Sequence, residues 1–239
     1  MKLFNLDSPL MQALNKVADL LWLNVLTLIC CLPVLTAGAS LTAMNYMALK
    51  IVRNEECYIT RGFFKSFKEN FRQATLIWLI ILVLFIILGA DFMVINGGGD
   101  TTFGKIMWGA VAGASILVIM TTTFVFPVLA KFENTIYRTV KNAFMISLMQ
   151  FPKTILIVVA YLAPVVLFFF FPQVMPLCFM FGLSLPAWIA AKLYNKFFKR
   201  LEDRVMAENP PQEKNDGGED ERIFRDELDP VLSDKDVAQ

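Results

Sequence analysis

The sequence contains no histidine among its 239 residues and only four cysteines. Without histidine, the chain lacks the commonest general base of enzymes and the commonest metal ligand. Cys30, Cys31 and Cys178 lie inside apolar runs, and Cys57 lies in a charged loop. We expect small apolar side chains and one free thiol here, with no disulfide framework, no metal site and no cofactor.

The motifs of common enzyme classes are also absent. The glycines at positions 97–99 are not followed by the Lys-Ser or Lys-Thr pair that completes a phosphate-binding loop. No G-x-S-x-G, H-E-x-x-H or C-x-x-C motif occurs in the chain. We therefore expect no catalytic residues and a protein that is not an enzyme.

Charge is missing over long stretches, although charged residues make up 18% of the chain and hydrophobic residues 56%. Residues 154–191 are 38 positions without Asp, Glu, Lys or Arg. A helix needs about 20 apolar residues to cross a hydrocarbon layer of about 30 Å, so this run equals about two crossings. The other charge-free runs are 20–49, 73–90 and 106–130. The pattern predicts an all-α fold, a polytopic helical membrane bundle with five to six membrane segments.

The predicted helical membrane domain covers residues 1–206. The first charge-free run is ambiguous, because 30 residues are too many for one crossing and few for two. Its second part, 40–52, either returns through the membrane, which gives six segments, or is short and re-entrant within the bundle, where irregular backbone must be buried. The predicted segments lie at about 17–36, 40–52, 73–95, 106–130, 154–171 and 175–195.

Basic residues predict the orientation. Lys and Arg gather between the first and second runs, between the third and fourth, and after the last, whereas the loop 91–105 has only Lys105. Loops rich in Lys and Arg face the cytosol. We expect a multi-pass protein of the cell membrane with a cytosolic C-terminus and, if 40–52 returns, a cytosolic N-terminus. On the cytosolic side, Glu133 could form an ion pair with a basic residue such as Arg53.

The last 33 residues, 207–239, have a different composition. They carry 11 acidic and 4 basic residues and include Pro-Pro and Gly-Gly pairs. Such a segment buries too little apolar surface to offset the entropy of ordering. We expect a disordered, acidic, cytosolic tail.

Few polar side chains lie within the apolar segments. Asn24 is deep in the first segment, where an amide more often bonds a neighbouring helix than a solute. Asn45, Tyr46 and Lys50 would place an amide, a phenol and an ammonium group inside the bundle if 40–52 is re-entrant. These four are the candidate polar positions of the bundle.

An amphipathic stretch at 61–72 precedes the second membrane segment. Aromatic rings recur every fourth residue and therefore share one helix face, with basic residues on the other faces. Such a helix can lie among lipid headgroups or dock a cytosolic partner. The candidate docking or lipid-facing residues are Phe63, Lys65, Phe67, Lys68, Phe71 and Arg72.

Three stretches, 32–43, 63–75 and 126–133, resemble the YesL-like family of bacterial integral membrane proteins. The resemblance covers about residues 1–205 and is most distinctive in the Phe/Lys/Asn block of 63–75. The family has no established molecular function and no defined site residues. Its members often accompany sugar-uptake and polysaccharide-degradation systems, so the resemblance implies a link to carbohydrate import.

From these features we expect a non-enzymatic integral membrane protein that is accessory or regulatory to carbohydrate uptake. The alternative is a small solute transporter or channel in its own right, built on helices broken by proline. Residues 1–206 carry 18 basic and 10 acidic residues, which favours contact with anionic lipids and not with nucleic acid. The expected partners are membrane lipids and a sugar transport complex, and the sequence does not indicate an oligomeric state.

Overall fold

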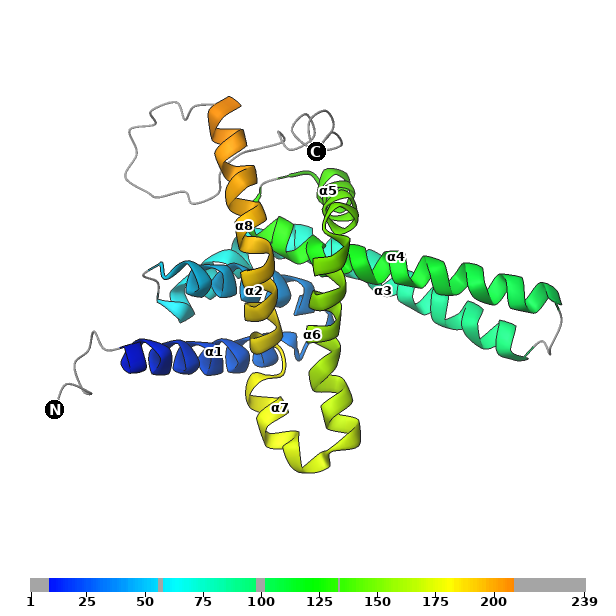
Figure 1. Ribbon diagram of the computed structural model, residues 1–239, viewed down its shortest axis with the longest axis horizontal. Helices are drawn as coiled ribbons and strands as arrows, with labels where there is room; N and C mark the ends of the chain where they lie inside the picture. The colour runs from blue at the N-terminus through cyan, green and yellow to red at the C-terminus, as the bar shows by residue number, and fades with distance from the viewer. Residues whose placement is uncertain (1–8, 56–57, 98–101, 133, 209–239) are drawn as a thin grey trace.

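The computed structural model describes residues 9–55, 58–97, 102–132 and 134–208, and these form an all-α fold (Figure 1). The predicted fold class is confirmed. The longer helices are α1 (Pro9–Cys31), α2 (Ala37–Arg53), α3 (Ile59–Gly97), α4 (Thr102–Lys131), α5 (Ile136–Met149), α6 (Phe151–Phe170) and α8 (Ser184–Glu208). The short elements are η1 (Val34–Thr36), η2 (Pro172–Val174) and α7 (Met175–Phe181).

Several helices have the length and composition of membrane spans. Within the described residues, α1, α3, α4 and α6 are each long and apolar enough to cross a bilayer. Helices α7 and α8 meet at a bend of 51° and could together form a fifth span. The chain therefore has the helix content of a polytopic membrane protein.

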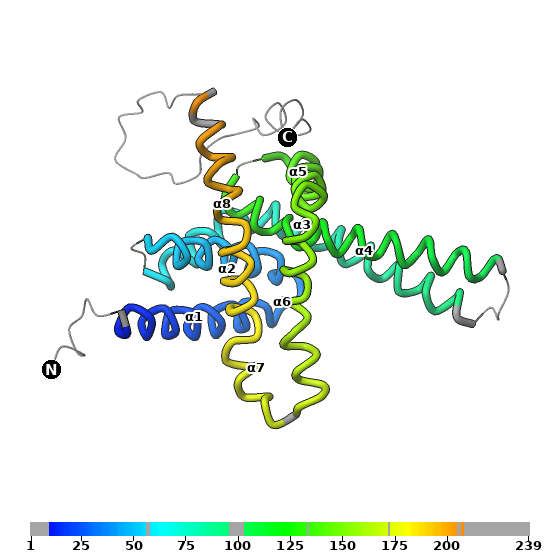
Figure 2. The backbone as a smooth tube through the Cα atoms, viewed as in Figure 1, coloured from blue at the N-terminus to red at the C-terminus, as the bar shows by residue number. Residues whose placement is uncertain are grey.

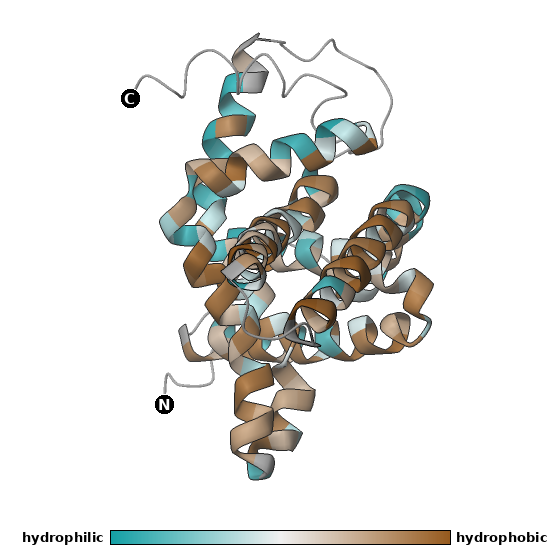
Figure 3. Ribbon diagram, turned by 90° about the vertical axis from the view of Figure 1, so that its right-hand side faces the viewer, coloured by the Kyte–Doolittle hydropathy of each residue, from teal (hydrophilic) through white to brown (hydrophobic). Residues whose placement is uncertain are grey.

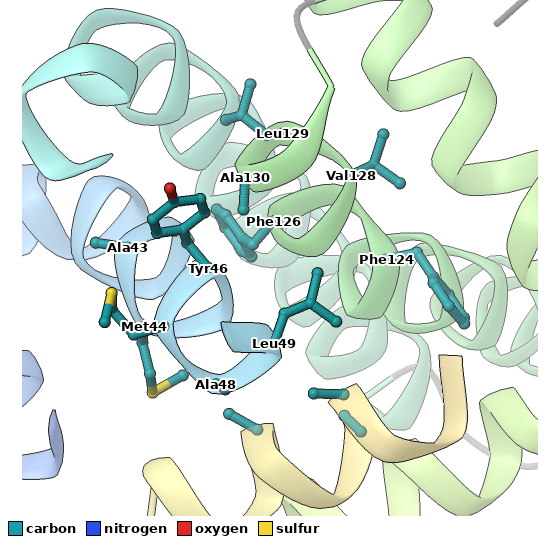
Figure 4. Packing of buried hydrophobic residues seen from close by; sticks show 14 of the residues in the cluster. Ala43, Met44, Tyr46, Ala48, Leu49, Phe124, Phe126, Val128, Leu129 and Ala130 are labelled. Carbon is teal, nitrogen blue, oxygen red and sulfur yellow. The ribbon is translucent and has the colours of Figure 1, made fainter. Parts of the chain in front are cut away.

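Helix α2 forms the centre of the molecule. It packs against α1, α3, α4 and α8, and nearly all of its residues are buried. Small residues at 37–40 allow the close approach, and a Cβ atom at Gly38 would lie 2.5 Å from the carbonyl oxygen of Ala74 in α3. Figure 4 shows Leu49 of α2 lying between this helix and α4. The core is thus built around one short, enclosed helix.

A tight turn connects α1 to α2. Pro33 lies between the helices, and the hydroxyl of Thr36 donates hydrogen bonds to the carbonyls of Cys30 and Pro33. The chain reverses here, so α2 runs back alongside α1 (Figure 2). Trp78 Nε1 donates to the carbonyl of Val34 over 2.8 Å, which fixes the turn beside the middle of α3. Because a helix rises about 1.5 Å per residue, α3 extends about 28 Å beyond this contact.

Two apolar hairpins diverge from the core. The α3–α4 hairpin and the α6–α7 hairpin point in different directions (Figure 1), and apolar residues predominate on both (Figure 3). In the most apolar 18 residues of α3 and of α6, the chain itself buries 11% of the positions. Most of the hairpin surface is therefore left for contact with other molecules.

The helix boundaries differ from the predicted segments in several places. The amphipathic stretch 61–72 and the segment 73–95 form one continuous helix, because Lys and Arg end an apolar run but are good helix formers. Helix α1 begins at Pro9, well before position 17, and the last predicted segment is broken between α7 and α8. Of the predicted tail, residues 209–239 lie outside the described residues.

Candidate functional site

A buried ion pair joins the end of α2 to α8. Arg53 Nη2 donates to Glu202 Oε1 at 2.7 Å, and Nη1 donates to Oε2 at 3.0 Å. Arg53 Nε donates to Asn195 Oδ1 at 2.9 Å. The side chains of Arg53 and Glu202 are 7% and 8% exposed. This bidentate geometry is the strongest form of an arginine–carboxylate contact.

Two further charges border this pair. Lys131 Nζ, at the end of α4, lies 4.0 Å from Glu202 Oε1, and Glu55 Oε1 lies 4.0 Å from Arg53 Nη1. The ends of α2 and α4 and the second half of α8 therefore meet at one point. Glu202 is thus a partner of Arg53. The Glu133 suggested by the sequence lies outside the described residues.

Four aromatic side chains pack together between the end of α4 and the part of α8 that precedes Glu202. The rings of Tyr194 and Phe198 lie 4.6 Å apart, Phe124 is 6.3 Å from Tyr194, and Phe132 is 5.6 Å from Phe198. All four are fully buried. The side chains of Arg53 and Glu202 are themselves almost fully buried, and in such low-dielectric surroundings the attraction between opposite charges is strengthened.

A cavity of about 310 Å³ lies among α2, α3, α4, α6 and the start of α8. Asn45 provides its amide, and the hydroxyl of Tyr161 lies 3.4 Å from Asn45 Oδ1, a long hydrogen bond. Trp78, Phe85 and Phe126 form much of the apolar wall. None of the described residues that line the cavity is acidic or basic, so its lining suits an apolar body with a single hydrogen-bonding group and not an ion.

Tyr46 and Lys50 are separate from this cavity, although they are on the same helix as Asn45. Lys50 Nζ lies 5.1 Å from the centroid of the Tyr46 ring, a cation–π contact within α2. Neither residue lines the cavity that contains Asn45. The three candidate residues of 40–52 thus do not form one site.

Asn24 holds the break between α7 and α8. Its Nδ2 donates to the carbonyl of Phe179 at 2.8 Å, and its Oδ1 accepts from the backbone N–H groups of Leu183 and Ser184 at 3.0 Å each. Helix ends leave such backbone groups without partners inside the helix. Asn24, itself fully buried, supplies those partners from α1 and so connects α1 to the break between α7 and α8.

The predicted face at 61–72 is divided between the interior and the surface. Phe63 is fully buried and stacks on Phe67 at 6.2 Å, and Phe67 lies 5.5 Å from Phe71, which is partly exposed. Phe63 is therefore a core residue and not part of a docking surface, which corrects the candidate set at this position. The exposed members of the candidate set are Phe71 and the three basic residues Lys65, Lys68 and Arg72.

Sequence reasoning missed three members of these sites: Asn195, Glu202 and Tyr161. Asn195 and Glu202 are seven positions apart and therefore share a helix face, which is a signal that the sequence does contain. No local pattern points from Arg53 to a partner 149 positions away. Within the described residues, no three His, Cys, Asp or Glu side chains are placed to hold a metal ion.

Comparison with known proteins gives one match. The model of a family described as "Protein of unknown function, DUF624" matches residues 19–92, which include most of α1, all of α2 and most of α3. No curated protein and no solved structure matches the chain. The family match supports a relationship to proteins of unknown function through the part of the chain that contains the α2 core, and it assigns no activity to any residue.

Proposed function

We propose that this chain is an accessory or regulatory subunit of a membrane assembly for carbohydrate uptake, without catalytic activity of its own. The divergence of the α3–α4 and α6–α7 hairpins from the α2 core carries this proposal. In the most apolar parts of these helices, 11% of the positions are buried in α3 and α6 and 33% in α4, so the hairpins present long apolar faces to lipid or to another protein. Membrane helices associate through such faces by close packing.

The carbohydrate part of the proposal depends on the sequence. The stretches 32–43 and 63–75 resemble the YesL-like family, whose members often accompany sugar-uptake systems. Both stretches lie within the segment 19–92 that matches the family of unknown function. They also form the turn into α2 and the part of α3 that packs on it, so the resemblance covers the scaffold that orients the α3–α4 hairpin.

We place the end of the molecule that contains Arg53, Lys131 and the second half of α8 in the cytosol. These residues converge in one ion cluster, so the ends of α2 and α4 share a side with the C-terminal part of α8. The connections at this end contain most of the Lys and Arg residues, which favours the cytosol. The start of α1 lies on the same side because α2 runs back alongside it.

Site-specific photocrosslinking in membranes tests the accessory role. A photoreactive residue at Ile86 of α3 or at Val165 of α6, both exposed, should crosslink to a membrane transport protein. The same residue at Ala43, buried in α2, is the matched control and should give no crosslink. A chain that purifies alone from gently solubilised membranes, with unchanged oligosaccharide uptake in cells lacking it, would overturn the proposal.

The cavity at Asn45 and Tyr161 favours a second candidate function, a small solute transporter. The break between α7 and α8 is of the kind that transporters use near their binding sites. This function requires solute flux in vesicles that contain only this protein, and Asn45→Ala should reduce that flux. Vesicles without flux would leave the accessory role as the better account.

A further inference from the structure

A groove of about 450 Å³ runs along the outside of the bundle where α5 meets α3 and α4. Its walls include Ile77, Ile80 and Leu84 of α3 and Leu117 and Val118 of α4. Thr121 and Thr122 of α4 also line the groove, but their hydroxyls donate to carbonyls of the same helix, at 2.7 and 2.8 Å. Because both hydroxyls are already hydrogen-bonded within α4, the wall formed by α3 and α4 offers mainly apolar contacts to a ligand.

Helix α5 forms a further wall of this groove and adds two polar side chains to its lining. One face of α5, which includes Thr139, Asn142 and Ile146, is buried in the protein. Tyr137 and Lys141 lie on another face, line the groove and are exposed. The apolar groove thus has an ammonium group and a phenol on its α5 wall.

The groove lies near the start of the apolar part of α3 and along the second half of α4. On α3 it begins five residues after Arg72, and on α4 it ends six residues before Lys131. From Ile77 to Leu84 the helix rises about 10 Å. One leaflet of a hydrocarbon layer of about 30 Å is about 15 Å deep, so the groove spans a large part of a single leaflet.

We propose that this groove binds one anionic diacyl phospholipid from the cytosolic leaflet. An acyl chain lies along the apolar wall of α3 and α4, and the headgroup phosphate pairs with Lys141 and accepts a hydrogen bond from Tyr137. Basic pockets beside membrane helices on the cytosolic side bind acidic lipid headgroups in this way. The proposal rests on the membrane orientation proposed above and not on the accessory role.

Lipid retention by the full-length protein tests this site. The purified, delipidated chain is mixed with phosphatidylglycerol and phosphatidylcholine of identical acyl chains, and the retained lipids are counted by native mass spectrometry. The wild type should retain phosphatidylglycerol in preference. Lys141→Gln should reduce that retention about fivefold, the contribution of one lysine at an anionic surface.

Three further variants separate the groove from general effects. Ile80→Trp fills the apolar wall and should reduce retention of both lipids. Lys65→Gln removes an exposed lysine outside the groove and should leave retention unchanged. Lys141→Arg keeps the charge and should retain phosphatidylglycerol, which shows that a loss in Lys141→Gln is not a folding defect.

Unchanged binding in both Lys141→Gln and Ile80→Trp would overturn the proposal, and so would an equal loss in Lys65→Gln or in Lys141→Arg. An equal loss with Lys65→Gln would indicate a diffuse attraction to the basic surface. A failure of the accessory role is distinguishable, because it would abolish the crosslinks from Ile86 and leave the lipid preference intact.

Discussion

Arg53 and Glu202 are 149 positions apart, yet they form a bidentate ion pair with N–O distances of 2.7 and 3.0 Å in the interior of the protein. The pair joins the last residue of α2 to the second half of α8. It therefore holds the central helix α2 against α8, the last of the described helices. The stability of the α2 core should depend on it.

Glu202→Gln should lower the free energy of unfolding by about 3 kcal/mol, because it leaves the buried guanidinium of Arg53 with only the exposed carboxylate of Glu55, 4.0 Å away, as a countercharge. The melting temperature of the purified protein in detergent is the measurement. Asp203→Asn is the matched control, since Asp203 is the exposed neighbour on the same helix. Equal melting temperatures for the two variants would contradict this role, whereas the double variant Arg53→Met with Glu202→Met should recover part of the loss.

Replacing Asn24 should loosen the break between α7 and α8. Asn24→Ala removes three hydrogen bonds and should cost about 2 kcal/mol. Asn24→Asp can replace all three hydrogen bonds only as the neutral acid, so its stability relative to Asn24→Ala should fall as the pH rises and the buried carboxyl group ionises. Thr121→Val, which removes a hydroxyl bonded only within its own helix, serves as control and should melt close to the wild type.

The close packing of α2 on α3 makes Gly38 sensitive to a single methyl group. In Gly38→Ala the new Cβ would meet the backbone oxygen of Ala74 at 2.5 Å and Trp78 Cβ at 2.6 Å, so the helices must separate. We expect a loss of about 1–3 kcal/mol. Gly113→Ala is the matched change in α4, where no atom lies within 4 Å, and it should be neutral or slightly stabilising. A Gly38→Ala protein as stable as Gly113→Ala would show that this contact does not constrain the core.

The helical, membrane-type fold could be predicted because long runs without charge permit few other structures in a protein. The arrangement of the helices could not. Phe63, Phe67 and Phe71 share a face by their spacing, but spacing alone does not say whether that face meets lipid, water or protein, and Phe63 lies in the core. The packing of α2 on four other helices is likewise a tertiary property.

The candidate polar residues stand out in the sequence because they lie inside apolar segments, but their partners could not be inferred. Asn24 bonds a helix break more than 150 positions away, and Arg53 bonds Glu202 at a similar separation. Such pairs depend on how helices distant in sequence pack together. Only the shared face of Asn195 and Glu202 on α8 was available in the sequence as a local signal.

The turn between α1 and α2 should lie within the membrane and not at its outer surface. Val34 and Leu35 are exposed apolar side chains, and Trp78 holds this turn beside the middle of α3. In a chain whose native cysteines have been replaced, Leu35→Cys should therefore resist a membrane-impermeant maleimide from both sides until detergent is added. Labelling of Leu35→Cys in intact cells would show instead that α2 crosses the whole bilayer.

The most direct test of the account is to determine on which side of the membrane the start of α3 and the tip of the α3–α4 hairpin lie. Tyr58, just before α3, and Phe103, at the start of α4, are both exposed aromatic residues and suit matched cysteine substitutions in the cysteine-free chain. With an impermeant maleimide, Phe103→Cys should be labelled in intact cells and Tyr58→Cys only after the membrane is permeabilised. Labelling of Tyr58→Cys from outside intact cells, or of neither position after permeabilisation, would contradict an apolar hairpin that crosses the membrane from a basic cytosolic end.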